Sequence, residues 1–192
     1  MSLLGERVLA VHRALDAASI PHAIGGAIAL GYCTADPRGT SDIDCNVFVE
    51  PEQAQAVFDA LPSEVRSSPE DVRLAERDGQ IRLWWDTTPV DLFFCYHPFH
   101  VGAGERARRV PFEGTDLPVL DCTDLAVFKC FFNRTKDWAD IEAMVAVGAV
   151  DVAALRRWLI ELLGTDDPRL ARLAQAVSAA VEGGGPARFD PA

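Results

Sequence analysis

Hydrophobic and polar residues follow two different periods along the chain, and the change falls near residue 120. Before it, short β-branched and apolar runs bounded by turn-forming residues predict strands. After it, apolar residues recur at the 3.6-residue spacing of amphipathic helices. The predicted strands cover 22–24, 42–50, 80–86 and 90–96, with a further hairpin over 109–121 around Glu113 and Gly114. The predicted helices cover 3–18, 27–33, 51–61, 123–133, 136–147, 151–163 and 167–182, and loops are expected over 62–79 and 101–109.

The connections between the predicted strands include both helical crossovers and hairpins, which favours a mixed sheet over a doubly wound parallel one. The fold class expected is therefore α+β, a mixed sheet flanked by helices and followed by a helical bundle. We expect an α/β core over residues 1–120, a helical region over 121–182 that completes the active site, and a flexible tail over 183–192.

Composition narrows the classes of partner. The 192-residue chain has a net charge of −11, which disfavours broad binding to nucleic acid or anionic membrane and suits a cationic substrate or a basic partner. No apolar run is long enough to span a membrane, and the N-terminal segment is charged throughout, unlike a signal peptide. The five cysteines, an odd number without a CxxC pair, are interpreted as reduced thiols of a cytoplasmic protein.

Carboxylates stand at the start of two predicted strands. Asp42 and Asp44 are two residues apart, so both point to one face of a strand, and Asp91 opens a later apolar strand. Clustered carboxylates repel one another unless a cation lies between them. If the two strands pair, three carboxylates converge and can hold two Mg²⁺ ions, with Mn²⁺ as the alternative. The structural alternative is that Asp42 and Asp44 cap a turn and Asp91 belongs to a hairpin.

Gly25 and Gly26 lie between the predicted strand 22–24 and the predicted helix 27–33. Glycines at such a turn let backbone N–H groups approach a phosphate at the positive end of a helix dipole. As structure alone the pair is only a turn. Together with the carboxylates, it predicts a site for a phosphate group and metal.

The order of these features resembles the nucleotidyltransferase superfamily of the DNA polymerase β type. The stretch GGAIALGYCTADPRGTSDIDCNVFV also resembles the R-x-T-x-D-I-D form found in the branch of AbiEii-type toxins and small bacterial nucleotidyltransferases, through Arg38, Thr40, Asp42 and Asp44. The resemblance implies that Asp42, Asp44 and Asp91 bind metal and catalyse. It also implies that Gly25, Gly26, Arg38 and Thr40 bind the nucleotide. One departure is that Ala27 and Ile28 follow the glycines where relatives often have a polar residue, so Arg82 and the 106–109 stretch are further candidates for the phosphates.

A second block, DCTDLAVFKCFFNRTKDWADIEAM, resembles the helical motif of the same branch. The resemblance implies that Lys129 binds the triphosphate and is catalytic, and that Asp140 is catalytic too, with Asp137 left open as the functional acid. The structural alternative is a lysine whose stem covers the core and an acidic first turn of a helix.

The function implied is transfer of a nucleoside monophosphate from an NTP to an acceptor. The toxin-like branch implies a tRNA acceptor and a cognate antitoxin. The alternatives are a small-molecule adenylyltransferase acting on aminoglycoside-like cations, for which the acidic charge is suited, and a non-catalytic nucleotide-binding regulator.

Overall fold

The computed structural model describes residues 2–182, which form two compact units. The first unit comprises the chain up to Ile28 together with Arg38–Leu120. The second comprises Ala29–Pro37 and the chain from Asp121. The predicted tail over 183–192 lies outside the described residues.

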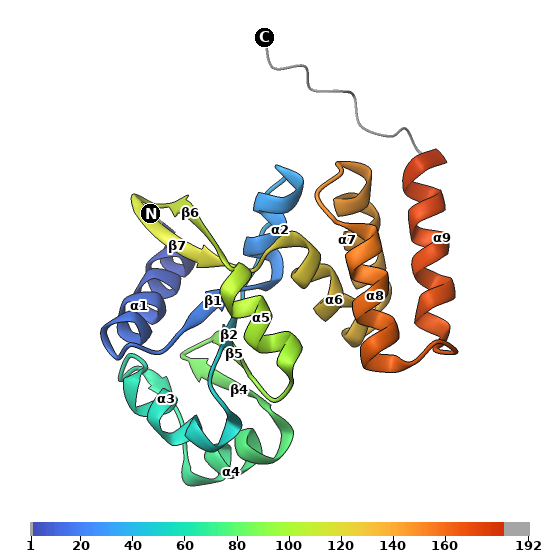
Figure 1. The fold of residues 1–192 in the computed structure, drawn as a ribbon. Coiled ribbons are helices and arrows are strands. Elements are labelled where there is room, and N and C mark those ends of the chain that lie inside the picture. Colours follow the sequence, from blue (N-terminus) through green and yellow to red (C-terminus); the bar gives the residue numbers. More distant parts are fainter. Residues whose placement is uncertain (1, 183–192) are drawn as a thin grey trace. The chain divides into compact units, whose positions relative to one another are not determined.

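A seven-stranded mixed sheet forms the first unit (Figure 1). The predicted mixed sheet is thus confirmed, with strand order β3-β4-β5-β2-β1-β7-β6. Its strands are β1 His22–Ile24, β2 Ile43–Val47, β3 Val65–Arg66, β4 Gln80–Trp85, β5 Thr88–Phe94, β6 Arg108–Phe112 and β7 Thr115–Val119. Two predicted hairpins, β4–β5 and β6–β7, are present as antiparallel pairs.

The register between β2 and β5 decides where the carboxylates lie. These two strands are parallel, and Asp44 is directly opposite Asp91. Asp44 and Asp91 have a sequence separation of 47, so the sequence pattern alone does not show whether their strands pair. The predicted site required this pairing, and the structure confirms it. β1 lies on the other side of β2 and pairs with it antiparallel.

Helices accompany the sheet in the first unit. They are α1 Leu3–Ala17, η1 Pro51–Gln53, α3 Ala54–Ala60, α4 Pro69–Asp78 and α5 Pro98–Arg106, and the first turn of α2 Gly26–Thr34 belongs to the same unit. The buried Arg7 of α1 donates to the carbonyl of Trp85, the hydroxyl of Thr88 and the carboxylate of Asp86 at 2.9, 2.6 and 2.6 Å. These bonds join the first helix to the β4–β5 turn.

Two segments predicted as loops are helical, and both were missed for local reasons. In the polar segment 62–79, Ser68 and Asp71 form a capping box and Pro69 occupies the first turn of α4. In the glycine-rich segment, the ring of His97 accepts from the backbone N–H of Phe99 and so caps α5. Glycine content suggested a loop. Capping by His97 and packing of the buried Phe99 outweigh the low helix propensity of the glycines.

Four helices make up most of the second unit, close to the predicted ranges. They are α6 Cys122–Phe132, α7 Thr135–Ala146, α8 Val152–Leu163 and α9 Pro168–Glu182. The sequence offers Thr123 or Asp121 as the cap of α6, and the structure has Asp121; Gly164 ends α8, as its place in the sequence predicts. None of the described helices combines the length and apolar character that crossing a membrane requires.

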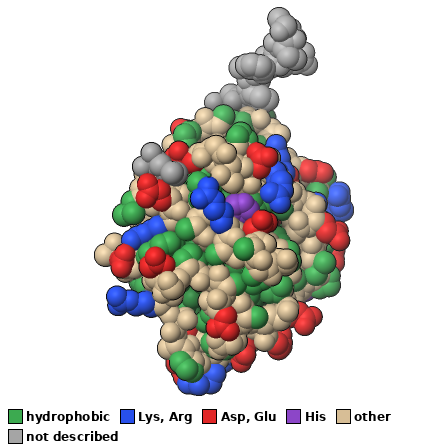
Figure 2. Space-filling model, turned by 90° about the vertical axis from the view of Figure 1, so that its left-hand side faces the viewer, with side chains coloured by type: hydrophobic (Ala, Val, Ile, Leu, Met, Phe, Trp, Pro, Cys, Tyr) green, Lys and Arg blue, Asp and Glu red, His purple; other side chains and the backbone are tan. Residues whose placement is uncertain are grey.

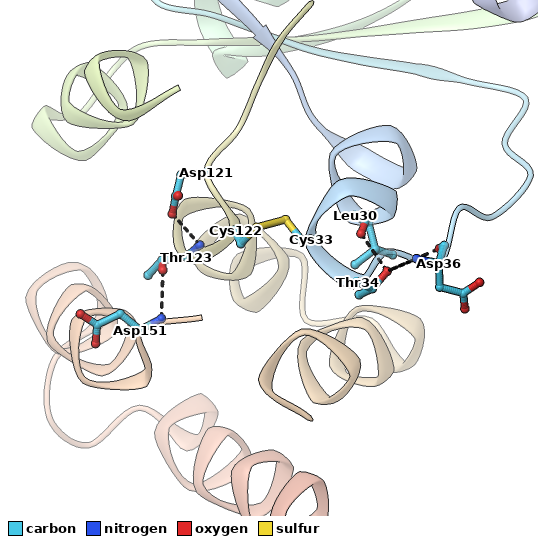
Figure 3. The surroundings of a disulfide bond; sticks show 8 residues. All are labelled: Leu30, Cys33, Thr34, Asp36, Asp121, Cys122, Thr123 and Asp151. Carbon is cyan, nitrogen blue, oxygen red and sulfur yellow. Dashed lines mark hydrogen bonds between the residues drawn. A yellow bond between two sulfur atoms is a disulfide. The ribbon is translucent and has the colours of Figure 1, made fainter. Parts of the chain in front are cut away.

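The prediction that all five cysteines are reduced is wrong for one pair. Cys33 near the end of α2 and Cys122 at the start of α6 form a disulfide, with Cα atoms 5.6 Å apart and a sequence separation of 89 (Figure 3). The argument for a cytoplasmic location from reduced thiols therefore does not extend to this pair. Cys45, Cys95 and Cys130 are free and buried, and burial raises the pKa of Cys45 and of Cys130 to about 12.

Candidate active site

Three carboxylates converge at the start of β2 and along β5. Asp42 immediately precedes β2, Asp44 lies within it, and Asp91 is opposite Asp44 on β5. Ile43 between the two aspartates is fully buried, because neighbouring residues on a strand face opposite sides. The sequence thus alternates a core side chain with two acids that share the other face.

The three aspartates fit a hard divalent cation. Each offers a carboxylate oxygen, and these atoms all lie within 4.8 Å of one another. All three side chains are half-buried, so water and a ligand can reach them. Carboxylate oxygens are the ligands that Mg²⁺ and Mn²⁺ prefer.

Arg82 on β4 holds the third carboxylate. Its Nε and Nη2 atoms donate to the two oxygens of Asp91 at 2.7 and 2.6 Å, and the two residues are directly opposite each other across the antiparallel pair. The hydrogen bond from Arg82 to Asp91 is the main cause that raises the pKa of Arg82, and the charges of Asp42 and Asp44 raise it further. The guanidinium is about half exposed, so one edge remains open to solvent.

Thr40 and Arg38 precede the carboxylates in the loop that enters β2. The Thr40 hydroxyl donates to the carboxylate of Asp42. The structure therefore gives Thr40 a positioning contact with a predicted metal ligand. Arg38 is exposed on the same loop.

The Gly25–Gly26 turn packs directly against Asp44. The backbone N–H of Gly25 donates to the carbonyl of Asp44 at 2.8 Å. Gly26 has φ +54°, and a Cβ there would lie 1.7 Å from the Asp44 carboxylate, so no larger residue fits. Because α2 begins at Gly26, its first N–H groups, which have no acceptor within the helix, start beside this carboxylate.

Asn46 was missed by the sequence interpretation. It follows Asp44 by two residues, so it shares the same face of β2, and it is buried. A Cβ on Gly25 would lie 2.9 Å from the Asn46 side-chain nitrogen, so a larger residue at this turn would have to displace the end of that side chain. The spacing in the stretch DIDCN could have pointed to this residue.

Lys129, Asp137 and Asp140 form a separate cluster within the second unit. The Lys129 ammonium donates to Asp140 at 2.7 Å and lies 3.7 Å from an oxygen of Asp137. All three side chains are buried. The resemblance-based prediction that Lys129 binds a triphosphate stays a prediction, and its contacts within the unit are an ion pair between α6 and α7.

Asp137 has a structural task that Asp140 lacks. Its carboxylate accepts from the backbone N–H of Arg134 at 3.1 Å and from the Arg134 guanidinium at 2.7 and 3.0 Å. Burial alone would raise the pKa of Asp137, but these bonds and the charge of Lys129 lower it below its ordinary value. Asp137 therefore fixes the start of α7, while Asp140 is the direct partner of Lys129.

Comparison with known proteins identifies the fold. No protein-family model matches the chain, and no curated protein matches it significantly. Among solved structures, an antigenic nucleotidyltransferase-like protein from Paracoccidioides brasiliensis matches with 16% identity over 96% of this chain and 95% of that one, at a TM-score of 0.51.

Two further structures match more loosely. JHP933 from Helicobacter pylori has 14% identity over 95% of this chain and 92% of its own, with a TM-score of 0.48. The antibiotic-resistance factor ANT(2″)-Ia has 14% identity over 94% and 83%, with a TM-score of 0.43. At these identities the likeness concerns the fold alone, and the first match shows that this chain has a nucleotidyltransferase-like fold.

Proposed function

We propose that the protein is a metal-dependent nucleotidyltransferase that moves a nucleoside monophosphate from an NTP to a hydroxyl of an acceptor. The observation that carries this proposal is the convergence of the Asp42, Asp44 and Asp91 oxygens within 4.8 Å beside a glycine turn that opens a helix. The nucleotidyltransferase-like fold supports it. Three clustered acids cost stability unless a cation compensates them, which disfavours the alternative of a non-catalytic regulator.

Each residue has a role in this reaction. Asp42, Asp44 and Asp91 would hold one or two divalent ions, Mg²⁺ or Mn²⁺, which when bound supply positive charge for the triphosphate and the attacking hydroxyl. The N–H groups at Gly26 and the start of α2 bind phosphate oxygens, and Gly25, whose N–H is bonded to the Asp44 carbonyl, fixes the turn that presents them. Thr40 orients Asp42, Arg82 orients Asp91, and Arg38 and the open edge of Arg82 are the nearby cations for the triphosphate.

The chemical step is an in-line displacement at the α-phosphorus. The acceptor hydroxyl oxygen forms the new bond to phosphorus, and Asp91 takes its proton as general base. The bond between the α-phosphorus and the bridging oxygen breaks, and pyrophosphate leaves with the electron pair. Arg82 keeps the Asp91 carboxylate in one orientation during this transfer.

For the acceptor we propose tRNA, as in the toxin-like branch that the R-x-T-x-D-I-D and (K)D-x-x-D stretches resemble, with a cognate antitoxin as the partner that such a toxin needs. The alternative acceptor is a polycationic small molecule, which the net charge of −11 favours.

One experiment tests activity and acceptor together. The protein is incubated with Mg²⁺ and each α-labelled NTP, with total tRNA in one series and an aminoglycoside panel in another. We expect label on tRNA that disappears with Asp44→Asn. Label on an aminoglycoside would contradict tRNA as the acceptor and support the small-molecule alternative. If no acceptor is labelled with any of the NTPs, the proposed activity is contradicted.

A further inference from the structure

The connection between α6 and α7 exposes an unusual run of side chains. Six consecutive residues, 131–136 with the sequence FFNRTK, are all exposed. Two are phenylalanines with exposed fractions of 37% and 38%, two are cations, and none is acidic. Adjacent exposed apolar side chains rimmed by polar groups are one feature of binding surfaces.

Arginine side chains stack on the aromatic rings in and around this run. The guanidinium of Arg134 lies 4.9 Å from the ring centre of Phe132. From α9, Arg169 lies 5.7 Å from the ring of Phe131. We call Phe131, Phe132, Arg134, Lys136, Arg169 and Arg172 the arginine–aromatic surface.

Arg172 connects the two parts of this surface. Its guanidinium lies 4.9 Å from the ring of Trp138 and donates to the side-chain oxygen of Asn133 at 3.0 Å. The indole N–H of Trp138 donates to the same Asn133 oxygen at 2.8 Å. The α6–α7 connection is therefore held against α9 by defined contacts, and the surface is built before any partner arrives.

The charge of the arginine–aromatic surface opposes that of the chain. Two of its cations bond to carboxylates within the described residues: Arg134 to Asp137, which is fully buried, and Arg169 to Asp167. What faces solvent is thus mainly positive, in a chain of net charge −11. By contrast, basic and acidic side chains are interspersed on the face shown in Figure 2.

We propose that the arginine–aromatic surface binds a single-stranded segment of RNA. Cations spaced along a surface match a phosphate backbone, and guanidinium planes and phenylalanine rings are platforms on which unpaired bases stack. Guanidinium groups already cover one face of each phenylalanine, which suits stacking and hinders insertion of the rings into lipid. The proposal rests on the proposed function, because it makes the bound RNA the acceptor, and it adds the surface that selects RNA.

Binding is measured without catalysis, by fluorescence anisotropy of a labelled 12-nucleotide single-stranded RNA in buffer free of divalent metal. The charge variant is Arg169→Gln with Arg172→Gln. The matched control is Arg156→Gln with Arg157→Gln, an exposed arginine pair on α8 with the same change of charge. We expect the charge variant to weaken binding about tenfold and to lower the slope of log affinity against log salt by about 1.4, since each phosphate contact on a single strand contributes about 0.7. The control is expected to leave both unchanged.

A second variant, Phe131→Leu with Phe132→Leu, keeps apolar volume and removes the rings. We expect a loss of at least about fivefold, because one stacked base contributes that much, with no change in the salt slope. A base-paired RNA of equal length should not show this ring dependence. Thermal unfolding of each variant establishes that it is folded. We expect the ring variant to fold, because both phenylalanines are exposed.

Several outcomes would overturn the proposal. Equal binding by wild type and both surface variants would do so, as would an equal loss in the Arg156/Arg157 control, which would indicate unspecific attraction. Binding to phosphatidylserine vesicles in place of RNA would assign the surface to a membrane. Ring-dependent RNA binding without any transfer activity would support the RNA-binding surface and contradict the proposed function. Transfer to a small molecule without RNA binding would support nucleotidyl transfer and contradict the RNA-binding surface.

Discussion

Both units contain a cluster of ionisable side chains, and the two clusters differ in how solvent reaches them. Asp42, Asp44 and Asp91 in the first unit are half-buried, and their oxygens lie within 4.8 Å of one another. Lys129 and Asp140 in the second unit are buried and bonded to each other at 2.7 Å. The first cluster gathers three carboxylates beside one arginine where a ligand can enter, and the second holds buried opposite charges in contact.

The difference separates a chemical role from a structural one. Like charges that are held together cost stability, so their presence indicates a ligand that compensates them. A buried ion pair can break even, but removing one partner leaves an unpaired buried charge. We therefore expect substitutions in the first cluster to affect activity and substitutions in the second to affect stability.

The largest effect is expected for Asp140→Ala. It leaves the buried Lys129 ammonium without its closest partner, and the free energy of unfolding should fall by about 3–5 kcal/mol. Urea unfolding measures this. The double variant Lys129→Met with Asp140→Leu should recover most of the loss, and a double variant as unstable as the single would contradict the ion-pair explanation.

Asp44→Asn should have the opposite profile. We expect nucleotidyl transfer to fall by about 10²–10³-fold, because one proposed ligand of the cation that would stabilise charge on the reacting phosphate is lost. The unfolding midpoint should stay the same or rise, since removing one of three clustered carboxylates relieves repulsion. Radiolabel transfer and urea unfolding of the same preparation test both halves, and a large loss of stability would break the contrast between the clusters.

The disulfide offers a test confined to the second unit. Replacing Cys33 and Cys122 by alanine should lower the free energy of unfolding by about 2–4 kcal/mol, because the bond closes a long loop in the unfolded chain. Urea unfolding with and without a dithiol reductant measures this. Reductant should destabilise the wild type and leave the double variant unchanged; equal sensitivity of both proteins would contradict the assignment.

Acid should destabilise the first unit through a buried imidazole. Burial lowers the pKa of His100 from 6.5 to about 4, so the unfolded chain binds a proton that the folded chain excludes between these values. The stabilising contribution is therefore complete above pH 6.5 and lost as pH falls toward 4, by at most about 3 kcal/mol. His100→Gln should flatten this part of the pH profile of urea unfolding, and an unchanged profile would exclude His100 as its cause.

The smallest loss of stability among the destabilising variants is expected for Gly26→Ala. The left-handed backbone costs an alanine about 1–2 kcal/mol, and its Cβ would displace the Asp44 carboxylate. The rate of nucleotidyl transfer should therefore fall by a larger factor than the backbone cost of about 1–2 kcal/mol explains. Gly114→Ala is the matched control, because it has φ +80° with no atom within 4 Å of its Cβ, so it carries the backbone cost alone.

Much of this molecule was predictable from local pattern. The helical periods over 123–182 gave four helices to within a few residues, because apolar spacing and end signals such as Asp121 and Gly164 act locally. The alternation of Asp42, Ile43 and Asp44 predicted that two acids share a face. Helices α4 and α5 were missed, because polar and glycine-rich composition obscured their capping residues.

The candidate site needed information that no local pattern carries. The sequence by itself determined which residues are acids, which glycines can turn, and that a mixed sheet would form. Only the tertiary structure decided that β5 lies beside β2 with Asp91 opposite Asp44, that Arg82 holds Asp91, and that Cys33 meets Cys122. Such pairings join residues far apart in the chain, and their register is set by the packing of the whole sheet and helices, which the order of residues along any one segment does not encode.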